Sequence, residues 1–300
     1  MRIAIAGASG LVGAALSDRL AKEGHAVIRL VRRTPAADAS DIFWDPAKGQ
    51  LDPAALDGVH ALINLSGENI AGGRWTAARK HAIRISRVSA TRLLSETLAK
   101  LARPPRVFVS ASATGYYGDR GAEELTESSP PGTGFLSEVC IEWERAAQPA
   151  ADAGIRVVNL RIGLVLTPRG GALAKMLTPF RLGLGGVVGA GRQYMSWIGL
   201  TDLLHVIQFA LVAETLSGPV NAVAPRPVTN REFTQTLGRV LRRPTLIPAP
   251  ALLVRAALGE MGQRLLLEGN RVLPARLLST GFEFATPELD SALRTELGVP

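Results

Sequence analysis

The sequence is poor in cysteine, in aromatic side chains and in long apolar runs. A single cysteine, Cys140, excludes an internal disulfide bond, and the four histidines show no metal-ligand spacing, so we expect no bound metal. No apolar run approaches the roughly 20 residues that cross a bilayer. Glycines and charges interrupt the apolar amino-terminal stretch, which argues against a signal peptide. We therefore expect a cytoplasmic protein without a membrane partner.

The net charge is +8, but the basic residues are dispersed along the chain. Aromatic residues make up only 5% of the sequence, so base-stacking surfaces are scarce and we expect no nucleic-acid partner. A small ligand that carries phosphate would explain part of the charge. The densest basic segment, 74–92, places Lys80, Arg84 and Arg87 at helical spacing, which is typical of a solvated helix face.

The first thirteen residues combine a strand-like apolar run with closely spaced glycines. Gly7, Gly10 and Gly13 follow the run, and an amphipathic stretch begins at Leu11. Glycines in this pattern allow a tight turn, close approach of the backbone to a phosphate, and close packing of a helix on a sheet. The free N–H groups at the start of such a helix bind an anion. A second strand-like run at 26–31 completes a βαβ unit, so the segment predicts a dinucleotide-binding site.

Strand-like and helical patterns alternate through the first half of the chain. The strand-like runs cover residues 3–6, 26–31, 61–65, 107–110 and 157–160. Helices are predicted at about 75–102 and 136–153, and a short helix begins at Asp52 and ends at Gly58. Alternation of this kind predicts an α/β protein with a Rossmann-like, doubly wound parallel sheet.

The residues that end the second strand choose between the two nicotinamide dinucleotides. An acidic residue there binds the ribose 2′-hydroxyl, whereas an arginine accommodates a 2′-phosphate. Here Arg32 and Arg33 end the strand, and the next acidic residue is Asp38. Forked guanidinium donors match phosphate geometry, so we expect NADP(H) rather than NAD(H) as the cofactor. The alternative is that the two arginines only solvate a strand end.

The sequence changes in character after about residue 165, where glycine-rich loops and short helices begin. We expect an NADP-binding Rossmann domain at 1–165 and a smaller, mostly substrate-binding C-terminal lobe at 166–300. Part of this lobe, about 187–225, is expected to return to the Rossmann sheet. Because no linker separates the lobes, they are expected to share one cleft, the usual place for a substrate.

Capping signals mark the helices of the second half. Thr201 with Asp202 is predicted to cap one helix, and Thr229 with Glu232 is predicted to form a capping box for the next. Asn221 is predicted to be a strand-end partner. Two further helices are expected, a leucine-rich one after Pro248 and a surface helix within 285–298.

Several short motifs recur in the order of a known superfamily. They are the glycine turn, 64–67 (NLSG), 109–112 (VSAS), Tyr117-Gly118 and 161–163 (RIG). In these motifs the chain resembles the extended short-chain dehydrogenase/reductase superfamily, of the nucleotide-sugar epimerase and dehydratase type. It resembles more closely the atypical subgroup called epimerase family proteins, and this likeness spans essentially the whole chain. The segments that carry it are 67–75, 135–144, 170–186 and 266–282.

The resemblance implies a catalytic tyrosine, with a lysine four residues later on the same helix face. In the superfamily the lysine lowers the pKa of the phenol, so that a proton moves together with the hydride. Here the corresponding positions hold Phe135 and Val139, neither of which exchanges a proton. Together with Trp143 they form a helix face typical of hydrophobic packing. Standard epimerase chemistry is therefore not expected from this pair.

Other residues near the expected nicotinamide region are candidates for the chemistry. Ser112 matches the catalytic serine of the superfamily. Tyr116 and Tyr117 follow on the next loop, where either one could replace the missing phenol, or both could only pack the turn. Tyr117 matches a structural position of the superfamily, so Tyr116 is the freer candidate. Glu68 and Asn69 are polar alternatives.

The resemblance also implies the cofactor contacts. Arg87 stands where much of the superfamily has an asparagine, and its guanidinium is expected to reach the pyrophosphate. The expected set is Gly7, Ser9, Gly10, Leu11, Val12 and Gly13 at the pyrophosphate, Arg32 and Arg33 at the 2′-phosphate, Asn64 and Leu65 on the adenosine side, Arg87, and Leu164 at the nicotinamide.

Two functions are compatible with these observations. The first is an NADP(H)-dependent oxidoreductase or epimerase-like enzyme that acts on an unidentified small molecule in the cleft. The alternative is a sensor or regulatory protein that binds NADP(H) without turning it over, a hypothesis motivated by Phe135 and Val139. Dimers are common in the superfamily, so a homodimer is a further expectation.

Overall fold

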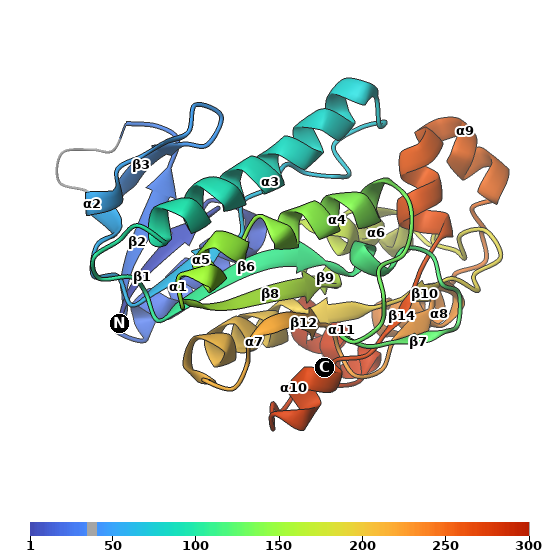
Figure 1. Ribbon diagram of the computed structural model, residues 1–300. Helices are drawn as coiled ribbons and strands as arrows, with labels where there is room; N and C mark the ends of the chain where they lie inside the picture. Colours follow the sequence, from blue (N-terminus) through green and yellow to red (C-terminus); the bar gives the residue numbers. More distant parts are fainter. Residues whose placement is uncertain (35–40, 300) are drawn as a thin grey trace.

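The computed structural model describes residues 1–34 and 41–299, and an eight-stranded sheet forms its centre (Figure 1). The strands of this sheet are β1 (Arg2–Ala6), β2 (Ala26–Val31), β3 (Ile42–Asp45), β4 (Gln50–Leu51), β5 (Ala61–Asn64), β6 (Val107–Ala113), β8 (Arg156–Ile162) and β12 (Gly218–Ala222). Their order is β12-β8-β6-β5-β1-β2-β3-β4, and every neighbouring pair is parallel except β3 with β4. The predicted α/β class, with a Rossmann-like doubly wound sheet, is confirmed.

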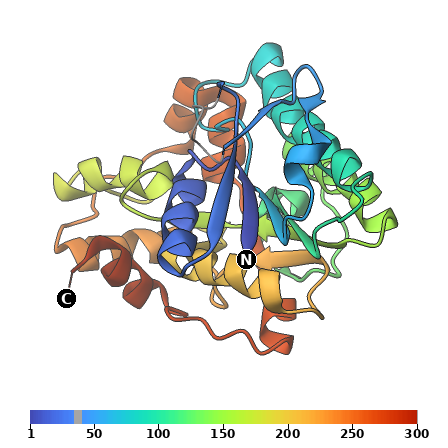
Figure 2. The same cartoon turned by 90° about the vertical axis from the view of Figure 1, so that its left-hand side faces the viewer.

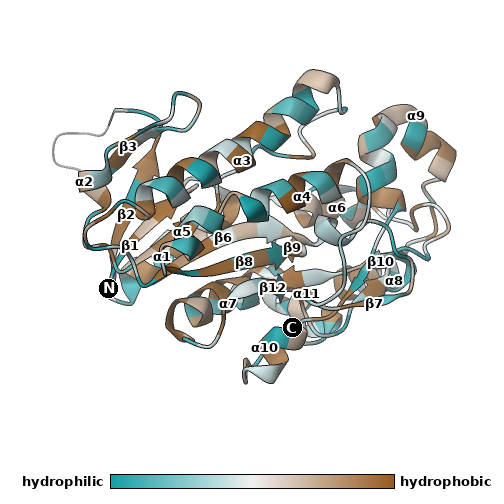
Figure 3. Cartoon of the chain, viewed as in Figure 1, coloured by the Kyte–Doolittle hydropathy of each residue, from teal (hydrophilic) through white to brown (hydrophobic). Residues whose placement is uncertain are grey.

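Helices cover both faces of the sheet, so its central strands are apolar on both sides. The helices of the first half are α1 (Leu11–Lys22), α2 (Pro53–Leu56), α3 (Ala77–Leu98), α4 (Phe135–Arg145) and α5 (Gln148–Asp152). In β1, Ile3 and Ile5 pack with α1, whereas Ala4 and Ala6 pack with α3. Figure 2 shows the blue α1 and the teal α3 on opposite sides of the strands. In Figure 3 the brown strands β2 and β8 lie inside, and α3 carries much teal.

The chain after β8 adds β12 to the sheet and builds a third hydrophobic cluster. Its helices are α6 (Gly171–Arg181), α7 (Leu200–Val212), α8 (Asn230–Leu241), α9 (Ala251–Gly262), α10 (Ala275–Ser279) and α11 (Leu289–Leu297). Its short strands include β9 (Leu164–Leu166), β11 (Trp197–Gly199) and β14 (Arg271–Val272). Trp197 is fully buried in the third cluster, among side chains of α6, α8 and α11. Within the described ranges, no helix is long and apolar enough to cross a membrane.

The capping signals correctly locate several helix ends. The Asp52 side chain accepts a hydrogen bond from the Ala54 N–H at the start of α2, and Thr229 with Glu232 forms the predicted capping box of α8. The predicted single helix at 136–153 is wrong, because α4 ends at Arg145 and α5 begins at Gln148. Pro149 has no backbone N–H and is accommodated in the first turn of the new helix.

Asp202 does not cap α7 as predicted. Gly199 takes that position, and the Asp202 carboxylate is fully buried one turn later. It accepts hydrogen bonds from the Ala285 N–H at 2.8 Å, the Thr286 N–H at 3.0 Å and the Thr286 hydroxyl at 2.7 Å. Asp202 therefore fastens the segment before α11 to the core. Asn221 is a partner within β12, as predicted, since its Nδ2 donates to the Leu273 carbonyl at 2.9 Å.

Replacing Asp202 by alanine is expected to destabilise the fold by about 2–4 kcal/mol, because buried donors of Ala285 and Thr286 lose their acceptor. The free energy of unfolding in urea measures this cost. The control Asp18→Ala removes an exposed carboxylate from α1 and is expected to stay within about 0.5 kcal/mol of the parent. Equal stability of the two variants would contradict the fastening role.

Candidate cofactor and active site

The glycine turn between β1 and α1 excludes larger side chains. Gly7 has a φ of +81°, and a Cβ there would lie 2.7 Å from the Leu65 carbonyl carbon. A Cβ on Gly13 would lie 2.1 Å from the Gly7 carbonyl oxygen. Gly10 occupies the N-cap of α1 and has no side chain, so the first N–H groups of the helix are open to an anion. The turn is therefore a cradle at the carboxyl edge of the sheet.

The other residues predicted at the pyrophosphate surround this cradle. Ser9 is exposed in the turn, and Val12 packs against the core below it. Leu11 is half-buried against the start of α6, where a Cβ on Gly170 would come within 3.1 Å of its side chain. The amino-terminal ends of α1 and α6 thus lie together beside the turn.

Arg32 and Arg33 are exposed directly after β2, the strand next to β1. Their place beside the cradle is the one expected of residues that contact the ribose end of a dinucleotide. Asp38, the next acidic residue in the sequence, lies outside the described residues.

Asn64 and Leu65 shape the loop after β5. The Asn64 side chain is fully buried, donates to Thr91 Oγ1 at 2.8 Å and accepts from the Ser66 N–H at 3.2 Å. Its amide is thus bonded within the protein, and Asn64 positions the loop. Leu65 is half-buried, and its carbonyl is the group that approaches Gly7.

Arg87 lies behind the same loop, on α3. Its Nη2 donates to the Glu68 carbonyl at 3.0 Å and its Nη1 donates to the Ile83 carbonyl at 3.1 Å. The guanidinium also stacks over Trp143, with 5.1 Å from Cζ to the ring centroid. Burial lowers the pKa of Arg87. Contact of this guanidinium with a pyrophosphate stays a prediction.

Glu68 and Asn69 are engaged in holding the loop. Glu68 Oε1 accepts from Arg79 Nη1 at 2.9 Å, and Asn69 Oδ1 accepts from the Ala71 N–H at 2.9 Å. Arg79 also donates to the Asn69 carbonyl. Both polar alternatives for the chemistry therefore have structural partners.

A buried hydrogen-bond network connects Ser112 of β6 to the neighbouring strand β8. Ser112 Oγ donates to Glu144 Oε1 at 2.7 Å, and Arg161 donates to the two Glu144 oxygens at 2.8 and 2.9 Å. Arg161 is only 3% exposed and pairs with Ser112 across β6 and β8. Its Nη1 donates to the Tyr117 hydroxyl at 2.9 Å, which in turn donates to Asn221 Oδ1 at 2.7 Å. The arrangement joins the three strands β6, β8 and β12 with α4 and the turn after β6.

This environment holds the buried groups in fixed protonation states. Burial raises the pKa of Tyr117 to about 12, and it raises the pKa of the Cys140 thiol to about 12 as well. Burial acts to lower the pKa of Arg161, but the hydrogen bonds and charge of Glu144 outweigh it and hold the pKa above its usual value. Near neutral pH, neither Tyr117 nor Cys140 exchanges its proton.

Tyr116 lacks the hydrogen bonds that hold the neighbouring Tyr117 hydroxyl in the described structure. It is half-buried in the 3₁₀ turn Thr114–Tyr117, and its ring centroid lies 3.4 Å from Arg161 Cζ and 5.2 Å from the Tyr117 ring. Among the residues that the structure describes, none hydrogen-bonds its hydroxyl. Stacking therefore fixes the ring and leaves the hydroxyl available.

Phe135 and Val139 form part of the packing face of α4, as predicted. The Phe135 ring meets Trp75 edge-on at 5.3 Å between centroids, and Lys80 Nζ lies 5.2 Å from the Phe135 centroid. Val139 and Trp143 are buried. The face that carries a tyrosine and a lysine in the superfamily is here an apolar contact with α3.

A small cavity of about 60 Å³ lies beside Phe135, between the loop after β6, the start of α4 and residues 264–270. Arg264, Glu268 and Asn270 give it a polar side. Leu164, predicted at the nicotinamide, begins β9 and donates its N–H to the Ser196 carbonyl at 2.8 Å. The small cavity and the start of β9 both lie beyond the carboxyl ends of β6 and β8, at the edge of the sheet where ligands of doubly wound folds bind.

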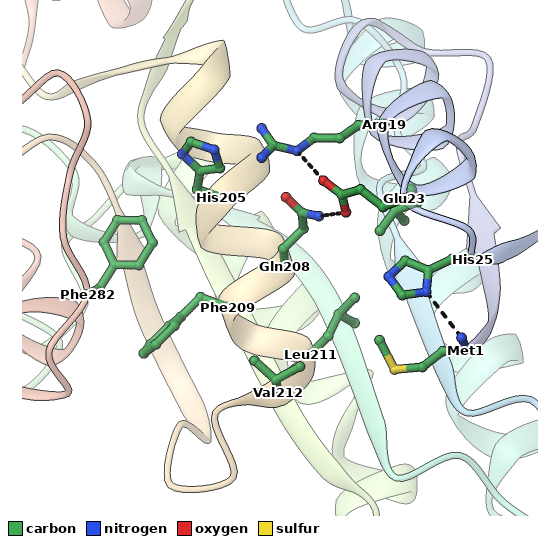
Figure 4. A pocket seen from close by; sticks show the side chains of 11 residues that line it. Met1, Arg19, Glu23, His25, His205, Gln208, Phe209, Leu211, Val212 and Phe282 are labelled. Atoms are coloured by element: carbon green, nitrogen blue, oxygen red, sulfur yellow. Dashed lines mark hydrogen bonds and ion pairs between the residues drawn. The ribbon is translucent and has the colours of Figure 1, made fainter.

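A larger hollow of about 410 Å³ lies at the other end of the sheet (Figure 4). Met1 and His25, at the amino ends of β1 and β2, line it together with α1 and α7. On its rim Arg19 pairs with Glu23, which also accepts from Gln208. Since cofactors of this fold bind at the carboxyl ends of the strands, the hollow is separate from the cradle.

Sequence reasoning did not identify the pairing of Arg161 with Glu144. One signal was present, because Arg161 lies between Leu160 and Ile162 in a strand-like segment, and a charge buried in a strand needs a partner. Glu144 lies four residues after Cys140, on the α4 face that packs against β6.

Within residues 1–34 and 41–299, no group of His, Cys, Asp or Glu could hold a metal.

The raised pKa of Tyr117 predicts a late step in a tyrosinate titration. The folded state favours the neutral phenol of Tyr117. The contribution of this residue to the stability of the fold is therefore complete below the unfolded-state pKa near 10, and it is lost as pH rises through about 12. The difference in ultraviolet absorbance between the parent and Tyr117→Phe should titrate near pH 12. Tyr194→Phe is the control that retains this step, and a Tyr117 midpoint near 10 would contradict its burial.

Comparisons with known proteins agree with this geometry. Residues 3–222 match the NAD dependent epimerase/dehydratase family, and residues 249–296 match a domain of unknown function. An epimerase family protein of Mycobacterium tuberculosis is 45% identical over 97% of this chain and 96% of its own length. The human epimerase family protein SDR39U1 is 39% identical over 98% of this chain and 99% of its own length. The crystal structure of its isoform 2 with NADPH has a TM-score of 0.90 at 37% identity, with 99% of both chains covered. The chain thus belongs to the NAD-dependent epimerase/dehydratase family, among the epimerase family proteins.

Proposed function

We propose that this chain binds NADP(H) along the carboxyl edge of its sheet and acts as an oxidoreductase on a small molecule. The observation that carries the proposal is the glycine cradle, where a Cβ at Gly7 or Gly13 would collide with backbone atoms. Such close packing brings the first N–H groups of α1 to a pyrophosphate. The NADPH in the structure of the human relative supports the same cofactor here.

Within this proposal, Arg32 and Arg33 select the phosphorylated cofactor. Both are exposed beside the cradle, and their forked donors suit a 2′-phosphate. Ser9, Gly10, Leu11 and Val12 hold the pyrophosphate with Arg87, and Leu65 and Leu164 line the adenosine and nicotinamide sides.

A bound nicotinamide would supply the hydride donor or acceptor. The chain's own proton chemistry is then limited to few groups, because Phe135 and Val139 replace the usual pair and Tyr117 keeps its proton. The Tyr116 hydroxyl is the phenol free to donate a proton to a substrate oxygen, with Arg161 stacked on its ring. The Ser112 hydroxyl donates its hydrogen bond to Glu144, so it contacts a substrate oxygen only when that bond is broken.

A sensor that binds NADP(H) without turnover is the second candidate. The apolar contact of Phe135 with Trp75 and the closed Ser112–Glu144 bond favour it, because they place structural contacts where the superfamily has reactive groups. Turnover with a suitable acceptor separates the two functions.

The cofactor proposal predicts that Arg32→Gln with Arg33→Gln weakens NADPH binding by about 10- to 100-fold, because charge-assisted bonds to the 2′-phosphate are lost. NADH binding should change little. Calorimetric titration of both cofactors measures this, and Arg145→Gln is the control at an exposed arginine on α4. Equal affinity of the parent for NADH and NADPH would overturn the selection by these arginines.

The enzymatic proposal predicts sustained NADPH consumption with at least one member of a panel of aldehydes, ketones and quinones. Tyr116→Phe should then lower kcat by about 10²-fold or more, as expected when a proton donor is lost, while the Kd for NADPH is retained. Tyr194→Phe is the matched control. Tight NADPH binding without consumption across the panel would favour the sensor, and full activity of Tyr116→Phe would remove Tyr116 from the chemistry.

A further inference from the structure

Six large apolar side chains are gathered on one surface of the C-terminal half. They belong to the loop that follows α6, the loop before α9 and the first turn of α9, and each is at least half exposed, Leu246 at 84%. We refer to them as the leucine surface, which consists of Leu182, Leu184, Leu246, Ile247, Leu252 and Leu253. Six of the eleven exposed large hydrophobic residues in the described part of the chain lie here. Apolar patches of this kind mark an interaction site.

The two segments that carry the surface run side by side. Arg243 Nε donates to the Arg181 carbonyl at 2.9 Å, and Val188 forms a parallel bridge with Ala249. A Cβ on Gly186 would lie 1.8 Å from the Ile247 carbonyl oxygen, so the chains are in direct contact. Figure 1 shows the yellow loop after α6 and the orange α9 together at the right-hand end of the molecule. The leucine surface is therefore continuous, although its parts are about sixty residues apart in sequence.

The charged residues within the two segments that carry this surface are all basic. The sequence has no aspartate or glutamate from 153 to 201 or from 233 to 259. Arg181, Arg242, Arg243 and Arg255 are exposed beside the leucines. Arg243 donates to a backbone carbonyl and Arg255 to Gln263, so neither of these two side chains is neutralised by a carboxylate. The surface thus attracts an anionic partner.

We propose that the leucine surface docks on an anionic lipid bilayer. A second copy of this chain fits it poorly, since a symmetric contact would bring the arginines of both copies together. Leucines inserted among acyl chains, with arginines at the level of the phosphates, fit both the apolar and the basic side chains of the surface. The expectation of no membrane partner rested on the absence of a spanning run, which does not bear on surface docking.

Flotation of the full-length protein with lipid vesicles tests the proposal. One set contains phosphatidylcholine alone, and the other contains one part phosphatidylglycerol to two parts phosphatidylcholine. The protein should float with the anionic vesicles, much less with the neutral ones, and should be released as salt is raised. Arg181→Gln with Arg242→Gln should weaken binding by about 25-fold, at about 1 kcal/mol for each charge.

The apolar contribution is tested by Leu246→Ser, alone and with Leu252→Ser and Leu253→Ser. The triple variant should lose at least about tenfold in binding, and the single variant, at a side chain 84% exposed, keeps the test valid if the triple variant unfolds. Leu278→Ser and the pair Arg106→Gln with Arg145→Gln alter exposed residues outside the surface and serve as controls.

Three results would overturn the proposal. The parent protein could fail to float with the anionic vesicles, or the surface variants could bind as tightly as the controls. The third is that sedimentation velocity finds a dimer that the leucine variants dissociate while no vesicle binding is seen, which would make the surface a contact between copies. A loss of binding confined to the surface variants, with NADPH affinity retained, would support docking.

Discussion

The buried pairing of Arg161 with Glu144 determines how much of the predicted active site is available for chemistry. Removing two charges from water is costly unless their hydrogen bonds are satisfied, and here Arg161 uses Nε and Nη2 on Glu144 and Nη1 on Tyr117. Ser112 supplies one more donor to the same carboxylate. The pairing therefore engages Ser112, which matches the catalytic serine of the superfamily, and Tyr117, one of the two candidate phenols, and it fixes both as structural partners of a charge.

The consequence is a separation between binding and reaction at one edge of the sheet. The cradle at Gly7 and Gly13 depends only on backbone geometry, so it persists whatever occupies the helix α4. The reactive positions depend on side chains, and here Phe135 packs with Trp75 and Ile83 while Val139 is buried. A fold of this type can thus keep its cofactor geometry while its proton chemistry is replaced or lost.

Features encoded by neighbouring residues were predictable from the sequence, and those that depend on distant partners were not. The glycine turn, the Asp52 cap and the Thr229 capping box each involve residues within a few positions, and the structure has all of them. Asp202 carried the same local signal as a cap, but its partners lie more than eighty residues away, and three hydrogen bonds outweigh one cap. The leucine surface could not be predicted from the sequence for the same reason, because its two segments meet only in the folded chain.

The stacking of Arg161 on Tyr116 links the structural network to the proposed chemistry. A guanidinium 3.4 Å from the ring centroid keeps a positive charge beside the phenol. In the superfamily a lysine on the helix places a cation beside the phenol, whereas here Arg161 places one from β8, anchored by Glu144. The guanidinium that immobilises Tyr117 by direct hydrogen bonding thus also lies beside Tyr116, whose hydroxyl has no partner in the described structure. Loss of the tyrosine and lysine from α4 therefore removes the usual groups without removing the combination of a phenol and a fixed cation from this edge of the sheet.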